Sequence, residues 1–429
     1  MIKYIWMVIQ DLFVAVTLVT LMHAVLCSCF GKKCARIHWA GVAAGVLSSV
    51  ALAFVKNNTN KIVSSRWNHK IYFVLLVLTA VFLILSLVNC REKKEKGGAG
   101  TVLTCLSGAG LSAVWLFYAL PGCIAYPFTF NSMGNGYLSW YFIQRVAGWL
   151  LAFLFMMIYS RLLFECAFRM RKKRLPARAL SLTILVNAFY CLCRFFVPWV
   201  NRAKWLNWPV SYDRNAHAWA ASLVGISSKY AMMFIWVTAA LALFIMIVFF
   251  AENTRVTDPY DNPAQLRKLR ARNRSCRRKA AGLLLCLGLS VISMTLVKAY
   301  DTREIALSEP ETYTVEDGRI LIPMETVSDG HLHRFEYRTD NDVNVRWIVV
   351  KKPGSASFGV GLDACEVCGN AGYYENNGKV ICKRCDVVMN INTIGFKGGC
   401  NPIPLAYEAE DGNLVFAIED LAAGEREFK

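Results

Sequence analysis

Long apolar stretches separated by short polar loops dominate the first 300 residues. A helix that crosses a bilayer core needs roughly 20 mostly apolar residues. Eight stretches reach that length, at about residues 5–30, 38–55, 71–90, 101–125, 138–168, 178–200, 222–250 and 280–299. The second is the weakest because it is short and rich in Ala, Gly and Ser. The pattern predicts a polytopic α-helical membrane domain of about eight transmembrane helices over residues 1–300.

The pattern changes at Asp301, where apolar and polar residues begin to alternate over short runs. Alternation with a period of two is typical of β-strands. It is found at Arg319–Pro323, Leu332–Tyr337, Val343–Val350, and Val380–Ile381 leading into Cys382. Asp340–Asp342 and Glu375–Gly378 predict turns, the second of which closes a hairpin. Residues 301–429 are therefore predicted to form one small, mainly β domain.

Composition and charge agree with a membrane protein that carries an acidic soluble tail. The chain is 55% hydrophobic and 18% charged, whereas a soluble domain has about 25% charged residues. Residues 1–300 hold 35 Lys or Arg against 8 Asp or Glu, a net charge of +27, and residues 301–429 hold 13 against 22, a net charge of −9. Basic loops between apolar runs indicate membrane topology. The expected partner is the lipid bilayer, and no nucleic acid is expected.

The basic residues are shared unequally between the two sets of alternate loops. One set holds 22 Lys or Arg, and the opposite set, together with the N-terminus, holds 8. The more basic loops remain in the cytoplasm. With eight spans, the chain is predicted to be a multi-pass protein of the cytoplasmic (plasma) membrane with both termini extracytoplasmic. A miscounted helix would place the C-terminal tail in the cytoplasm instead. The weak span at 38–55 is where such an error would arise.

Four ionisable residues lie within the predicted spans at a similar depth, roughly 10 Å below the outer surface: Asp11, Arg145, Arg194 and Lys229. Ionisable groups at such depth mark a pathway or ligand site by default, so these four are candidates for binding a cofactor. The alternative is that the long side chains extend to the interface and Asp11 pairs with one of them.

Other polar residues of the spans have simpler interpretations. Arg161 and Glu165 are spaced for an ordinary i,i+4 ion pair. His23 could serve a haem or a metal, although a hydrogen-bonded packing histidine is the commoner case. The cysteines before residue 300 show no metal-ligand grouping, so we interpret them as small apolar residues.

The tail contains a cysteine motif with the spacing of a metal site. Cys365 and Cys368 form one C-x₂-C pair, and Cys382 and Cys385 form another after 13 intervening residues. Two such pairs on either side of a hairpin can place four sulfurs around one ion. Tetrahedral sulfur ligation suits zinc or iron–sulfur centres equally. The alternatives are two structural disulfides or a redox-active dithiol.

Two histidines form a second candidate metal site. His331 and His333 open a predicted strand, where alternate residues project from one face. Both imidazoles could then ligate one ion of copper, zinc or iron. Two exposed polar residues beside a turn are an equally good interpretation of this spacing.

The cysteine motif lies within a longer pattern, formed by Leu362–Gly369, Gly372–Tyr373, Val380–Asp386, Thr393–Gly395 and Gly399–Leu405, with Asp329–Tyr337 and Val345–Trp347 upstream. Over about residues 318–407 this pattern resembles the FtrD-like membrane iron–sulfur family. The resemblance implies a bacterial membrane protein associated with iron uptake, accompanied by an iron permease and an extracytoplasmic iron-binding protein. It also implies an iron–sulfur, electron-transferring role. The implied ligands are Cys365, Cys368, Cys382 and Cys385, with Cys400, His331 and His333 as further candidates.

Three functions remain open from the sequence. The first is an electron-transfer component with a metal centre in the tail. The second is a module that captures iron, copper or zinc and hands it to a permease, which the acidic tail would favour. The third is a structural zinc ribbon that docks a partner. Because no nucleophile–base constellation, P-loop or dinucleotide fingerprint occurs in the chain, an autonomous hydrolase or ATP-driven pump is not expected.

Overall fold

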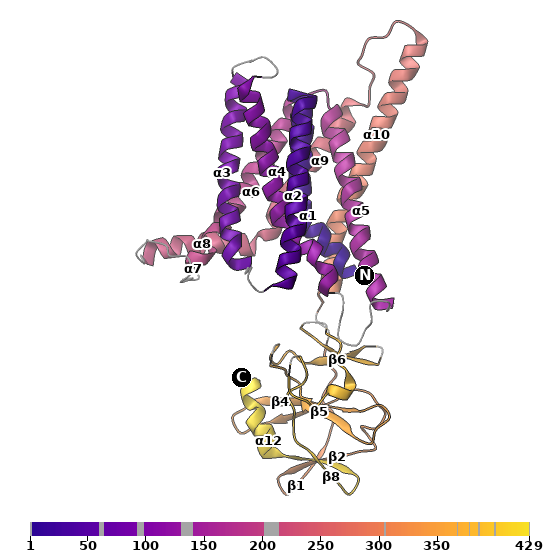
Figure 1. The fold of residues 1–429 in the computed structure, drawn as a ribbon. Coiled ribbons are helices and arrows are strands. Elements are labelled where there is room, and N and C mark those ends of the chain that lie inside the picture. Colours follow the sequence, from indigo (N-terminus) through magenta and orange to yellow (C-terminus); the bar gives the residue numbers. More distant parts are fainter. Residues whose placement is uncertain are drawn as a thin grey trace. The chain divides into compact units, whose positions relative to one another are not determined.

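The computed structural model describes residues 2–59, 64–91, 98–129, 140–200, 214–303, 306–366, 368–376, 378–384, 387–398 and 400–428 (Figure 1). A helical unit extends to Asp301, and a second compact unit contains the chain from Thr302 onward. Within the described ranges, eight helices are long and apolar enough to cross a membrane. The prediction of a polytopic helical protein with a small sheet-rich C-terminal domain is confirmed.

The helical unit comprises α1 (Ile2–Phe30), α2 (Lys32–Asn58), α3 (Ser64–Arg91), α4 (Ala99–Ala125), η1 (Tyr126–Thr129), α5 (Trp140–Arg169), α6 (Arg174–Phe195), α7 (Val197–Val200), α8 (Arg214–Lys229), α9 (Ala231–Glu252), α10 (Pro263–Ile292), η3 (Ser293–Val297) and α11 (Lys298–Asp301). Helix α1 contacts α2, α4, α6, α9 and α10. Its Leu12, Phe13 and Leu21 are fully buried. Because α1 is surrounded by other helices, it forms the centre of the apolar core of this unit.

The weak second span, α2, is explained by its packing against α4. A Cβ atom on Gly41 would lie 2.6 Å from the Ala109 carbonyl oxygen, and one on Gly45 would lie 2.8 Å from Cα of Ala113. Small residues spaced four apart let two membrane helices approach closely. The residues that lower the hydropathy of α2 are therefore the ones that fit it to its neighbour.

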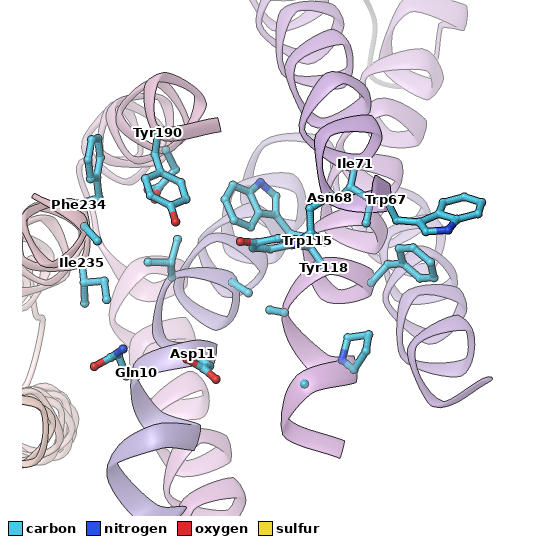
Figure 2. Close-up of a pocket in the computed structure, with 18 of the residues that line it drawn as sticks. Gln10, Asp11, Trp67, Asn68, Ile71, Trp115, Tyr118, Tyr190, Phe234 and Ile235 are labelled. Carbon is cyan, nitrogen blue, oxygen red and sulfur yellow. The ribbon is translucent and has the colours of Figure 1, made fainter. Parts of the chain in front are cut away.

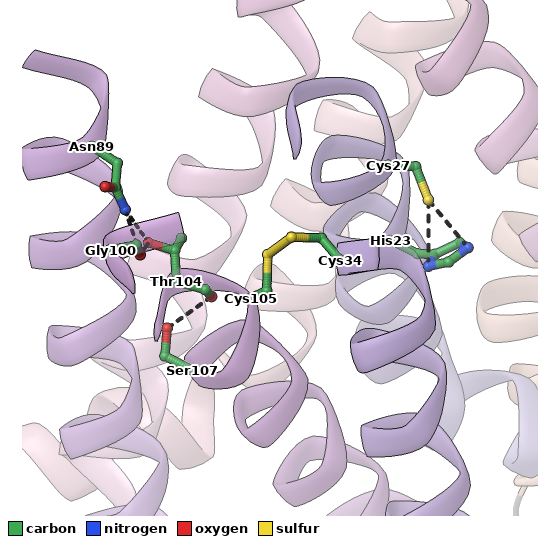
Figure 3. The surroundings of a disulfide bond; sticks show 8 residues. All are labelled: His23, Cys27, Cys34, Asn89, Gly100, Thr104, Cys105 and Ser107. Carbon is green, nitrogen blue, oxygen red and sulfur yellow. Dashed lines mark hydrogen bonds between the residues drawn. A yellow bond between two sulfur atoms is a disulfide. The ribbon is translucent and has the colours of Figure 1, made fainter. Parts of the chain in front are cut away.

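A disulfide between Cys34 and Cys105 also joins α2 to α4 (Figure 3). The interpretation of the membrane cysteines as small apolar residues is wrong for this pair. Sequence spacing gave no signal, because 71 positions separate the two residues. Both side chains are buried, so the bond adds a covalent link inside the most closely packed helix pair.

Two predicted spans have different limits in the structure. The seventh begins at Ala231 rather than at 222, because α8 ends at Lys229 and Tyr230 separates it from α9. The eighth begins within a longer helix that starts at Pro263, where the Asn262 side chain accepts a hydrogen bond from the Gln265 amide at 2.8 Å and caps the helix. Much of the basic loop that precedes this span is thus helical.

The described residues of the C-terminal unit form three antiparallel sheets. One sheet has the strand order β1 (Thr314–Glu316), β2 (Arg319–Pro323), β9 (Asn413–Ala417) and β8 (Glu408–Glu410); another has β3 (His333–Arg338), β4 (Asn344–Lys351) and β5 (Phe358–Leu362); the third is the hairpin β6 (Tyr373–Asn376) and β7 (Lys379–Cys382). Short helices η4 (Ile391–Thr393), α12 (Ile418–Ala423) and η5 (Gly424–Glu427) complete it. The predicted strands and the predicted hairpin are confirmed, whereas β1, β5, β8 and β9 were not predicted.

A buried carboxylate connects the strands around the cysteine motif. Asp363 is fully buried and follows β5. One of its oxygens accepts hydrogen bonds from Nε of Arg334 at 3.1 Å and Nε of Arg346 at 3.2 Å, and the other accepts from the Tyr373 amide at 2.8 Å. The Arg334 guanidinium also donates to the Tyr373 carbonyl oxygen and to Ser308. Strands β3, β4 and β6 are therefore held to the same charged group.

We expect Asp363→Asn to destabilise the C-terminal unit by about 3–5 kcal/mol, because it leaves a buried guanidinium without its counter-charge. Hydrogen–deuterium exchange of the full chain would measure this as faster exchange in β3, β4 and β6. The control is Asp342→Asn, which removes an exposed pair with Arg338 and should change exchange little. Equal exchange in the two variants would contradict the role of Asp363.

Candidate metal centre

Three of the predicted cysteine ligands come together in the C-terminal unit. The sulfur atoms of Cys365, Cys368 and Cys382 all lie within 4.8 Å of one another. The first two belong to the turn that follows β5, and the third is the last residue of β7. All three side chains are buried. The hairpin β6–β7 thus brings Cys382 to the first C-x₂-C pair.

The backbone of the first C-x₂-C turn is fixed by its own hydrogen bonds. The amide of Cys365 donates to the carbonyl oxygen of Gly369 at 3.1 Å, and the Gly369 amide donates back to Cys365 at 2.9 Å. Gly369 has a φ of 67°, which glycine adopts without the strain that a side chain would impose. The amide of Cys368 points to Sγ of Cys365 at 3.1 Å, a contact that stabilises a thiolate.

Apolar residues enclose the three sulfurs. Ile348, Val350 and Met389 belong to the same buried cluster. Tyr373 lies beside Cys365, and its hydroxyl donates to the carbonyl oxygen of Cys400 at 2.6 Å. Burial, reinforced by the negative charge of a Cys365 thiolate, raises the pKa of this phenol far above its usual range, so Tyr373 remains a neutral donor. Water is kept from the sulfurs by this shell.

The other two predicted cysteine ligands are placed differently. Cys400 is partly buried and packs against the cluster, but it is not one of the three whose sulfurs converge. Cys385 lies outside the described residues. Its predicted role as the fourth ligand therefore remains a prediction.

The donor set fits a metal ion bound by thiolates. Four sulfurs at about 2.3 Å from one ion are separated from one another by about 3.8 Å, and the three described sulfurs all lie within 4.8 Å of one another. Buried thiols on a fixed turn, with an amide directed at one of them, match the requirements of such a site. A cluster in which each cysteine binds a different iron needs a wider spacing of sulfurs than a single ion does.

The two predicted histidines bind separate carboxylates. His331 Nδ1 is 2.8 Å from Oε1 of Glu375. His333 is hydrogen-bonded through Nδ1 to Glu311 at 3.0 Å and through Nε2 to Oδ1 of Asp329 at 2.8 Å. The same Asp329 oxygen accepts from the backbone amide of His331 at 2.8 Å. The histidines could be recognised as a pair in the sequence. Their partners Glu311 and Glu375 are remote in sequence, and Asp329 forms no recognisable motif with them.

Among the four intramembrane candidates, Asp11 lines a cavity of about 560 Å³ (Figure 2). The cavity is bounded by α1, α2, α3, α4, α6 and α9, and Figure 2 shows Tyr118 and Tyr190 beside it. The Asp11 carboxylate accepts a hydrogen bond from the Tyr126 hydroxyl at 2.6 Å. The partner of Asp11 is thus a phenol that the sequence did not indicate.

The remaining three candidates lie at other places. Arg194 is the second-last residue of α6 and lies beside the Tyr72 hydroxyl. Lys229 is the exposed last residue of α8, with its ammonium 5.5 Å from the centre of the Tyr230 ring. Arg145 is half-buried on α5. Lys229 precedes the seventh span instead of lying within it, because that span begins at Ala231.

The ion pair between Arg161 and Glu165 is confirmed, with 3.0 Å between Nη2 and Oε1. Glu165 also accepts from Arg169 and, at 2.8 Å, from Lys279 of α10. It therefore connects α5 to the last span and does more than the local i,i+4 pairing that the sequence predicted.

The histidine contacts generate a pH prediction. Burial alone would lower the pKa of His333, but hydrogen bonds with Asp329 and Glu311 outweigh it, so the pKa is raised above 6.5. A raised pKa in the folded state stabilises the fold below the unfolded value, and this stability is lost as pH rises through the folded value. We expect hydrogen exchange in β3 to be slower at pH 6 than at pH 8 beyond the intrinsic rate change, and this difference to shrink in His333→Gln. An unchanged difference in His333→Gln would contradict the prediction.

Comparison with known proteins supports the resemblance seen in the sequence. Searches of curated proteins and of solved structures find no match to this chain. Residues 327–428, which contain the three converging cysteines, match the family model described as "Membrane iron-sulfur containing protein FtrD-like". The predicted resemblance is therefore confirmed for this region: residues 327–428 are similar to the FtrD-like family, and the described part of the chain also has eight helices able to span a membrane.

Proposed function

We propose that this membrane protein is an electron-transfer component of a bacterial iron-uptake system, with an iron centre held by Cys365, Cys368, Cys382 and Cys385. The observation that carries the proposal is the convergence of three buried sulfurs inside the region that matches an iron–sulfur family. Iron bound by thiolates supplies a one-electron couple. The family description supports iron over zinc, and the close spacing of the sulfurs supports a compact centre.

The surrounding residues suit a redox site. The cysteines are buried, which lowers the dielectric response around a charged centre. Arg384 donates to the carbonyl oxygen of Cys368 at 3.1 Å and places a positive charge next to the turn. The amide of Cys368 and the neutral phenol of Tyr373 are directed to the same region. These groups favour the more negative, reduced state of a thiolate centre.

The proposed location follows from the loop charges. The excess of basic residues in one set of loops supports a cytoplasmic location of those loops and an extracytoplasmic location of the C-terminal unit. There it would exchange electrons with an extracytoplasmic iron-binding protein and serve an iron permease, the partners that the family resemblance implies. The net charge of −9 over residues 301–429 supports association with cations or basic partners at low ionic strength.

A metal-handover role is the second candidate, and one observation favours it. His331, His333, Glu311, Asp329 and Glu375 form a connected group in which both imidazoles contact carboxylates. These ligand types bind divalent first-row metals. Reversible binding of Fe²⁺ or Zn²⁺ that is lost in a His331→Ala/His333→Ala variant, with the cysteine-bound metal retained, would establish this role beside the first.

We expect Cys382→Ser to remove most of the bound metal and to destabilise the C-terminal unit, because one converging sulfur is lost. The control is Cys286→Ser, which alters a buried thiol of α10 and should leave the metal content unchanged. Metal and sulfide analysis with an absorption spectrum of the anaerobically purified full chain would measure both. Equal metal content in wild type and Cys382→Ser would contradict the proposed ligands, and one zinc in a colourless protein would replace electron transfer by a structural role.

The proposed orientation can be tested separately. An alkaline phosphatase fused after the C-terminus should be active, and green fluorescent protein fused there should be dark, because the tail is proposed to be extracytoplasmic. The same reporters inserted near Asp258, in a basic loop, should give the reverse. An active fluorescent fusion at the C-terminus would place the domain in the cytoplasm.

A further inference from the structure

A second cavity, of about 850 Å³, lies between α1, α2, α4 and α5. Its walls are formed mostly by Leu, Val, Ile, Met and Phe side chains. At its edge, Trp39 is 59% exposed and Met157 is 62% exposed. Large apolar residues exposed on a membrane-spanning helix face the lipid. The edge formed by these two residues therefore faces the hydrocarbon, which gives a ligand a path from the bilayer. The exposed Arg161, which is paired with Glu165, also lines the cavity.

One end of this cavity carries hydrogen-bonding groups. His23 and His38 both line it, with 3.2 Å between their Nδ1 atoms. His38 Nε2 is 2.9 Å from the Ser112 hydroxyl. Thr20 and Ser160, which also line the cavity, are hydrogen-bonded to each other at 2.7 Å. Polar groups placed together at the end of an apolar cavity are typical of a site that orients a ligand.

One proton arrangement of the hydrogen-bond chain leaves a donor at His23. A bond between two imidazole Nδ1 atoms needs one donor and one acceptor. When Ser112 donates to His38 and His38 donates to His23, the proton of His23 is on Nε2. The neighbour of this nitrogen is Sγ of Cys27 at 3.5 Å, a weak acceptor (Figure 3). A ligand oxygen is a stronger acceptor than this sulfur.

Aromatic rings hold His23 in place. Its imidazole stacks on Phe164 with a centroid separation of 5.3 Å and meets the edge of Trp39 at 5.0 Å. Phe164 and Trp39 also line the cavity. The disulfide of Cys34, four residues before His38, fixes this part of α2 against α4. A planar ring that enters beside His23 would find flat surfaces and a positioned donor.

The rest of the cavity is apolar and elongated. From His23 to Leu12, both of which line it, α1 rises by about 17 Å. Leu120 and Ile124 of α4 lie among the lining residues without polar groups. The site thus combines a polar end for a planar head with an apolar length for a hydrocarbon tail. A fatty-acyl chain would leave the donors unused, and a water-soluble ligand would not suit the opening to lipid.

We propose that this cavity binds a lipid-soluble quinone, whose ring carbonyl accepts a hydrogen bond from Nε2 of His23. The ring lies beside His23, in the part of the cavity that Phe164 and Trp39 also line, and the isoprenoid tail extends along α1 past Val16 toward Leu12. This binding depends on the helical unit alone. It does not rest on the metal content of the C-terminal unit, so either proposal can fail without the other.

The test is saturable binding of decylubiquinone to the full chain in lipid nanodiscs, measured against protein-free nanodiscs. Wild type should bind above simple partition. His23→Ala should weaken binding by about tenfold, the effect of one lost hydrogen bond, and His23→Gln should retain much of it. The control is His69→Ala, an imidazole on α3 that is not among the lining residues of the cavity, which should bind as wild type does.

A second variant keeps the proposal testable if His23→Ala does not fold. Met157→Trp fills the exposed edge of the cavity and leaves the hydrogen-bond chain intact, so it too should weaken binding. Three results would overturn the proposal: no binding above partition, equal affinity of His23→Ala and His69→Ala, or a haem absorption band in the purified protein that disappears in His23→Ala. The last would assign the cavity to haem.

Discussion

The buried carboxylate of Asp363 is the contact on which the C-terminal unit depends. It forms ion pairs both with Arg334, a guanidinium that is itself almost completely buried, and with Arg346, which is partly exposed. A lone charge in such a place is strongly unfavourable, so the buried Arg334 depends on Asp363 as its counter-charge. Asp363 also precedes Cys365 by two residues and binds the amide of Tyr373, where β6 begins. The segments that carry Cys365 and Cys382 are therefore connected through the contacts of Asp363.

Much of the fold was predictable because its signals are local. Apolar length identified eight spans, and alternation identified β2, β3, β4 and the hairpin β6–β7. Contacts between segments that are far apart in the sequence were not predicted. The disulfide of Cys34 and Cys105 and the pairing of β2 with β9 join residues far apart in the chain. The break at Tyr230 was missed because hydropathy continues across it.

The candidate site was predictable to a similar degree and for the same reason. The spacing of the two C-x₂-C pairs is a local signal, and the structure brings Cys365, Cys368 and Cys382 together. The partners of the histidines were not predictable, since Glu311 and Glu375 reach them from other segments. The pair formed by His23 and His38 was not predicted, because the two imidazoles belong to different helices and a single histidine forms no sequence motif.

Helix α10 projects beyond the other helices of its unit (Figure 1). From Pro263 to Lys279 it rises by about 24 Å, while the Debye length in physiological salt is about 8 Å. Its basic residues are therefore distributed along a rod longer than the reach of a screened charge. The basic residues near Arg267 lie about 18 Å along the helix from Lys279, farther than a screened charge at either place can influence what binds at the other. One continuous helix thus presents two electrostatically independent surfaces.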